Sequence, residues 1–180
     1  MKRRQFIKAS MITGAAIGLG SALWLSDDVD HSALTIAAVL AKITELSKQS
    51  LITTGVWNLQ QVLEHCAQSV EYSMTGYPEH KSEIFKQTLG ALAFRAFSSK
   101  GVMTHALDEY IPGAPNLSSP LLKEQSKQQA FARLQHSLEQ FKQYQGPLAP
   151  HFAYGVLSKA EYELAHSMHF YNHLEQIQQI

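Results

Sequence analysis

The stretch HSMHFYNHLEQI, from His166 to Ile177, carries three of the chain's nine histidines within eight residues. On a helical wheel these histidines fall within about 60° of one another, because an α-helix turns by about 100° per residue. Phe170 and Ile177 share their side, whereas Asn172 and Glu175 lie opposite. The stretch therefore predicts a final helix whose histidines face the core, and other helices must then cover that face.

Apolar residues recur at helical spacing in four further segments upstream of this stretch. The predicted helices are Ser32 to Lys48, Asn58 to Met74, Ser82 to Ser99 and a fourth from Ser119 to the stop at Gly146 and Pro147, followed by the last helix from Ser158. Capping-box patterns mark two of the starts, Asn58 with Gln61 and Ser158 with Glu161, and Ser119 with Pro120 marks another. On the third helix, Phe85, Leu89, Leu92 and Ala96 form the predicted apolar stripe. No alternating strand pattern, phosphate-binding loop or C-x-x-C motif occurs, so we expect an all-α fold, built as a helical bundle.

A long connection separates the third and fourth predicted helices. It reads GVMTHALDEYIPGAPNLSS, from Gly101 to Ser119. Its two prolines and two glycines, in a polar setting, exclude a regular helix. Connections of this length are uncommon in compact domains and usually cross the fold or cover a site. We therefore expect this connection to cross the fold or to cover a site.

The N-terminus has the pattern of an export signal, with a charged start and an uncharged run from Ala9 to Leu25. Within it, RRQFIK resembles the twin-arginine (Tat) signal, which implies export of a folded protein by the twin-arginine machinery to the periplasm. The alternative is an uncleaved segment that anchors the protein in the membrane. We therefore expect residues 1–30 to be a signal or anchor and residues 31–180 to be a single domain.

Charge and cysteine content restrict the function further. Basic and acidic residues number 15 each, and cleavage of the signal after Ala22 would take four basic residues and leave 11 against 15 acidic ones. This balance argues against a nucleic-acid partner. The single cysteine, Cys66, cannot form an internal disulfide, and we expect it to be a buried structural thiol.

The histidine spacing is compatible with a metal site. His169 and His173 stand four residues apart, so both imidazoles project from one patch of the helix and can reach the same ion. A third protein ligand must come from elsewhere, and periodicity does not select among His65, His105, His136 and His151. His65 lies on the flank of its helix, about 120° from the centre of the apolar stripe. The alternative is that the histidines only pack in the core, each satisfied by ordinary hydrogen bonds.

Several segments resemble the DinB-like (YfiT-like) superfamily of metal-dependent four-helix-bundle proteins. The resemblance rests on Trp57 with His65 eight positions later, on His169 and His173, and on the segments TGVWNLQQVLEHCAQSVEYSMTGYP, IPGAP and PHFAYGVLSKAEYELAHSMHFYNHL. It covers about Ser32 to Ile177 and is closest to an exported branch of unknown function. It implies a four-helix bundle in which the helix at 82–99 belongs to the crossover connection.

The resemblance also implies a site. His65, His169 and His173 would bind one divalent ion, zinc or nickel, and leave positions for water or a small-molecule substrate. Some superfamily members transfer low-molecular-weight thiols and others are hydrolases, so the reaction stays open and no catalytic residue is named. We expect His166 to orient a ligand through a hydrogen bond, although it could instead be a fourth ligand.

Three further expectations accompany this site. Glu64 is expected on the solvated surface. Tyr154, Tyr162 and His151 could line the mouth of the cavity or pack in the core. The alternative function is a non-catalytic bundle that binds a metal or small ligand, and a homodimer is a further prediction.

Overall fold

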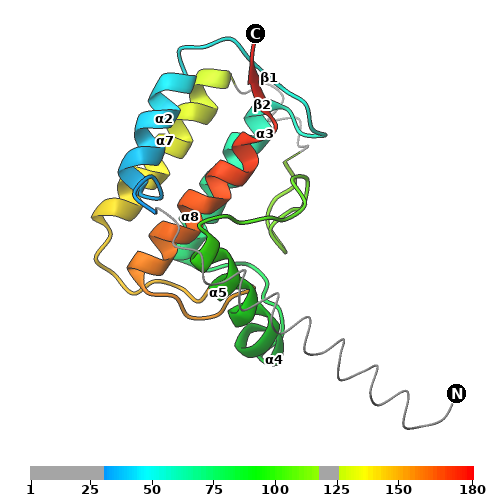
Figure 1. The fold of residues 1–180 in the computed structure, drawn as a ribbon, viewed down its shortest axis with the longest axis vertical. Helices are drawn as coiled ribbons and strands as arrows, with labels where there is room; N and C mark the ends of the chain where they lie inside the picture. Colours follow the sequence, from blue (N-terminus) through cyan, green and yellow to red (C-terminus); the bar gives the residue numbers. More distant parts are fainter. Residues whose placement is uncertain (1–30, 118–125) are drawn as a thin grey trace, which may run out of the picture.

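The computed structural model describes residues 31–117 and 126–180, and this part of the chain is mostly helical (Figure 1). The predicted all-α fold class is confirmed, apart from two strands of three residues each. The helices are α2 (Ile36–Leu46), α3 (Leu59–Thr75), α4 (Glu83–Phe85), η1 (Lys86–Gly90), α5 (Ala91–Lys100), α7 (Lys127–Gln143) and α8 (Lys159–Leu174). The predicted signal at 1–30 and the predicted helix start at Ser119 and Pro120 lie outside the described residues. Within the described ranges, no helix has the length and apolarity needed to cross a membrane.

Four long helices enclose the core. α3 contacts both α7 and α8, and α2 contacts the same two helices (Figure 1). Leucine, isoleucine, phenylalanine and methionine side chains fill the space between them, including Ile43, Leu63, Leu134, Phe141 and Met168, each fully buried. Burial of each such side chain contributes about 1.5–3 kcal/mol, which explains why these stripes hold the helices together.

Reciprocal side-chain caps mark where three of the long helices begin. Asn58 accepts a hydrogen bond from the Gln61 backbone N–H, and the Gln61 side chain accepts one from the Asn58 backbone N–H. Ser126 with Gln129 and Ser158 with Glu161 form the same reciprocal arrangement. The capping boxes predicted at Asn58 and Ser158 are therefore confirmed, and each cap is worth about 1 kcal/mol.

The helix predicted at 82–99 is present but irregular. A wide π-helical turn, η1, separates the short α4 from α5. The predicted apolar stripe is wrong at two positions, because Leu89 is 63% exposed and Leu92 is 61% exposed, whereas Lys86 is buried. A π-turn takes up more residues than an α-turn, so it rotates the following side chains away from the face that 3.6-residue periodicity predicts.

The two strands were not predicted. β1 (Leu51–Thr53) and β2 (Ile177–Gln179) pair antiparallel, with Leu51 opposite Gln179 and Thr53 opposite Ile177. The last helix ends at Leu174, so the predicted helical position of Ile177 is wrong. Three residues are too few to show an alternating pattern, and each strand finds its partner only through the tertiary fold.

Candidate metal centre

Two helices bring three histidines together. His65 extends from the middle of α3, and His169 and His173 extend from consecutive turns of α8. One ring nitrogen of each lies within 4.8 Å of the others, and the Nε2 atoms of His65 and His169 are 3.1 Å apart. We call these three residues the histidine triad. The structure thus brings together the three residues that the sequence resemblance singled out, although His65 precedes His169 by 104 residues in the sequence.

The position of His65 follows from how α3 is covered. α7 packs on one side of α3 and α8 contacts another, so the helix is buried around nearly its whole circumference. His65 is 3% exposed although the sequence places it on a flank. Its flank is the side that meets α8, and its ring centroid lies 4.9 Å from that of His169 and 4.8 Å from that of His173.

Trp57 packs against two of the three triad histidines. It lies just before α3 and is buried. Its ring stacks parallel to His173, with centroids 6.1 Å apart and 7° between planes, and it contacts His65 at 4.9 Å. A rigid aromatic ring against two imidazoles restricts their side-chain rotation, which keeps their nitrogens directed toward each other.

The triad is electrically neutral in the folded protein. Burial, and next the neighbouring His105, lowers the pKa of His65 to about 3. Burial, and next His65, lowers the pKa of His173 to about 2. Burial followed by the charge of His173 lowers the pKa of His169 well below its usual range. A neutral imidazole keeps a lone pair on one ring nitrogen, and metal binding requires that lone pair.

The donor set fits a divalent metal ion. His173 Nε2 is buried without a hydrogen-bond partner. Buried unpaired nitrogens are uncommon in proteins and call for an explanation such as an ion. Nitrogens that share a tetrahedral ion at about 2.1 Å stand roughly 3.4 Å apart, so small side-chain rotations suffice to bring all three within bonding distance.

His105 is a fourth imidazole beside the triad, and the sequence did not select it over His136 or His151. It lies in the connection between α5 and α7, with its ring centroid 5.0 Å from that of His173 and 5.1 Å from that of His169. Its Nδ1 is 2.7 Å from the carbonyl oxygen of Ala106, whereas its Nε2 is buried without a partner. The connection therefore lies beside the triad, and its expected role, to cross the fold or to cover a site, stays a prediction.

A cavity of about 310 Å³ opens beside the triad. The described residues of the connection form one wall, Phe85 of α4 and the loop at 151–154 form another, and α3 and α8 supply the histidines. Most of its lining is apolar or aromatic, and the polar groups include Lys81, His105 and Glu109. Its size and character are those of small-molecule sites.

The remaining predicted residues divide between the cavity and the core. His151 and Tyr154 line the cavity, whereas Tyr162 is fully buried and its hydroxyl donates to the Ala149 carbonyl at 2.7 Å. His166 also lines the cavity, and its Nε2 lies 3.2 Å from Ser73 Oγ. His136 is on the exposed face of α7. Among the described residues, His166 forms no hydrogen bond with a triad histidine.

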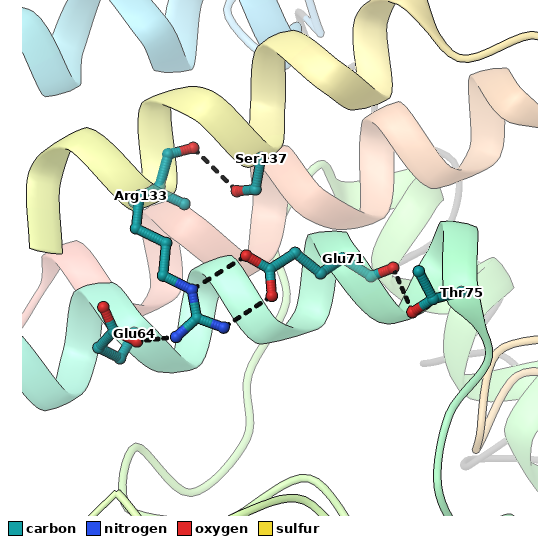
Figure 2. Close-up of polar contacts among 6 residues, drawn as sticks. Glu64, Glu71, Thr75, Arg133 and Ser137 are labelled. Carbon is teal, nitrogen blue, oxygen red and sulfur yellow. Dashed lines mark hydrogen bonds and ion pairs between the residues drawn. The ribbon is translucent and has the colours of Figure 1, made fainter. Parts of the chain in front are cut away.

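Two polar residues lie in the interior, contrary to expectation. Glu64 was predicted on the surface but is 0% exposed, because α7 covers it and Arg133 of that helix forms an ion pair with its carboxylate (Figure 2). Asn172, predicted on the polar side of α8, is also buried, and its Oδ1 accepts a hydrogen bond from the His105 backbone N–H at 3.4 Å. In both cases a segment distant in sequence covers a helix face that is polar in composition.

Comparison with known proteins yields one family. A model described as a protein of unknown function, DUF1569, matches residues 27–180. No curated protein and no solved structure matches the chain.

Proposed function

This chain belongs to the DUF1569 family, and from the histidine triad we propose that it binds one divalent metal ion through His65, His169 and His173. The observation that carries the proposal is the convergence of three neutral imidazoles within 4.8 Å, one of them with a buried and unpartnered Nε2. Zinc and nickel suit such a nitrogen donor set. The fold is proposed to be a DinB-like four-helix bundle of α2, α3, α7 and α8, supported by their mutual contacts.

The reaction is proposed to be a metal-dependent transformation of a small molecule, either hydrolysis or thiol transfer. An ion held by three histidines retains open coordination positions and lowers the pKa of a water or thiol that binds there. The largely apolar cavity beside the triad is large enough for a small organic molecule. His105 and Glu109 line this cavity, and we propose them as candidate proton acceptors for the reaction.

A non-catalytic metal-binding module is the second candidate, and His105 favours it. With its unpartnered Nε2 beside the triad, His105 could supply a fourth nitrogen and complete a tetrahedral shell. A complete shell leaves no position for substrate. The two candidates therefore differ in whether His105 binds the ion.

Metal content tests the proposal directly. We expect the full chain, purified without chelators, to hold about one zinc or nickel ion per chain by elemental analysis, since three ligands are sufficient for a stable site. Substitution of His65, His169 or His173 by alanine should remove most of the metal. His136→Ala, which changes an exposed histidine on α7, is the matched control and should retain it. A wild-type protein without stoichiometric metal would refute the proposal.

Cobalt substitution separates the two candidates in the same experiment. If the centre is open, azide added to the cobalt-loaded wild-type protein changes the visible absorption spectrum. If His105 closes the centre, azide has no effect on the wild type and changes the spectrum only in His105→Ala.

A further inference from the structure

Gln176 contacts His173 at the Nδ1 atom of its ring. Its side-chain Nε2 is 3.1 Å from His173 Nδ1, and the residue is 3% exposed. Among the described residues, His173 is the triad histidine that has a side-chain partner at Nδ1; the Nδ1 of His65 has none. Histidines that bind metal through Nε2 almost always donate Nδ1–H to such a partner, which fixes the tautomer and the ring orientation.

Two buried atoms of this pair lack partners, His173 Nε2 and Gln176 Oε1. With the amide nitrogen toward His173, Nδ1 must accept, so the proton of the neutral ring is on Nε2 and blocks metal binding there. A half-turn of the amide exchanges its oxygen and nitrogen. Oε1 then accepts from Nδ1–H, and the lone pair of Nε2 becomes available to an ion. With one rotation and one ion, His173 Nε2 and Gln176 Oε1 both gain partners, and the amide nitrogen takes the former place of Oε1 beside Gly55.

The β1–β2 ribbon holds Gln176 in this place. The backbone carbonyl of Gln176 accepts hydrogen bonds from the Thr54 N–H at 2.9 Å and from Thr54 Oγ1 at 3.3 Å. Gly55 leaves the space that the amide occupies, because a Cβ atom at residue 55 would lie 2.1 Å from Gln176 Oε1. The short ribbon thus ties the end of α8 to the segment before α3.

We propose that Gln176 is a positioning residue of the metal centre, and that it sets His173 in the tautomer that binds metal through Nε2. This inference rests on the proposed function. It assigns a role to the ribbon and to Gly55, which otherwise have no connection with the histidines.

Isosteric variants test the role of the amide oxygen. Gln176→Met keeps the size of the side chain but removes the acceptor, and we expect it to weaken zinc binding 10- to 100-fold in competition with a chelator dye. Gln176→Glu keeps an acceptor, so it should bind zinc at least as tightly as the wild type. Gln178→Met, on the exposed part of β2, is the matched control and should leave affinity unchanged.

The glycine provides a second and independent variant. Gly55→Ala should displace the amide and weaken zinc binding to a similar extent, and the double variant Gly55→Ala/Gln176→Met should lose little more than either single one. Nitrogen-15 spectra of the zinc-loaded wild type should show His173 protonated at Nδ1. A purely structural role for Gln176 would lower the stability of the metal-free protein without rescue of affinity by glutamate.

The results distinguish the two proposals. If the wild type binds no zinc, the proposed function fails. If the wild type and Gln176→Met bind zinc with equal affinity, or if Gln176→Glu binds as weakly as Gln176→Met, the assignment of Gln176 is wrong while the metal site stands.

Discussion

At the scale of single residues, the buried carboxylate of Glu64 shows how strongly one neighbour determines whether a polar side chain can be interior. Arg133 forms an ion pair with Glu64 and binds Glu71 through two hydrogen bonds of 3.0 and 2.7 Å (Figure 2). Both glutamates belong to α3 and the arginine to α7, so the pairs cross the helix interface. Desolvation of such charges offsets much of their mutual attraction, but removal of one partner leaves the other charge buried.

Removal of the arginine should therefore be costly. Arg133→Met leaves the Glu64 charge buried without its guanidinium, and we expect a loss of about 3–5 kcal/mol in the free energy of unfolding, measured with urea. The double variant Glu64→Gln/Arg133→Met should recover part of that loss, since the buried charge is then absent. Arg95→Met, at an exposed position of α5, is the control. A loss below about 1 kcal/mol for Arg133→Met would mean that the pair is effectively solvated.

At the scale of elements, the crossover formed by α4, η1 and α5 builds a wall of the cavity through one close backbone approach. Gly90 ends the π-helical turn and lies against the loop that contributes Ala153 and Tyr154 to the cavity lining. A Cβ atom at residue 90 would be 1.9 Å from the carbonyl oxygen of Ala153. Only glycine allows these two segments to meet at this distance, so the residue determines how the crossover docks.

Gly90→Ala tests this docking. We expect a loss of about 1–3 kcal/mol in stability, because the crossover must move away from the loop, together with faster hydrogen exchange across residues 82–100. Metal content should be unchanged, since the triad lies on α3 and α8. Gln87→Ala, exposed in the same turn, should show neither effect. Unchanged exchange in Gly90→Ala would contradict the assigned contact.

At the scale of the whole molecule, the interior holds several neutral histidines. Burial is the largest cause in each case and lowers the pKa of His65, His151 and His166 to about 3 and that of His173 to about 2. In an unfolded chain these groups have pKa values near about 6.5. Between these limits the unfolded state binds protons and the folded state does not, so falling pH favours unfolding.

The metal-free protein should therefore lose stability as pH falls below about 6.5, by roughly 2 kcal/mol at pH 5 for each such histidine. Above about pH 6.5 this contribution is fully retained. The check is the urea midpoint at pH 7 and at pH 5 in the presence of a chelator. His166→Gln, which keeps a polar group near Ser73, should flatten the pH dependence by about one proton, whereas the exposed His136→Gln should not. Equal wild-type midpoints at the two pH values would rule out neutral buried histidines.

The features that the sequence alone determined are local ones. Apolar periodicity placed the long helices, reciprocal side-chain caps marked two of their starts, and four-residue spacing put His169 and His173 on one patch, because each depends on neighbours within one or two helical turns. The π-turn and the two short strands were not predicted. The π-turn shifts the helical period, and three residues are too few to show an alternating strand pattern.

The tertiary structure alone decided which distant groups meet. Periodicity left the third histidine open among four candidates, and the packing of α3 against α8 brought His65 to the pair. It also turned His166 toward Ser73, brought His105 beside the triad and buried Glu64 against Arg133. These contacts join different helices and loops, and no spacing within one segment encodes them.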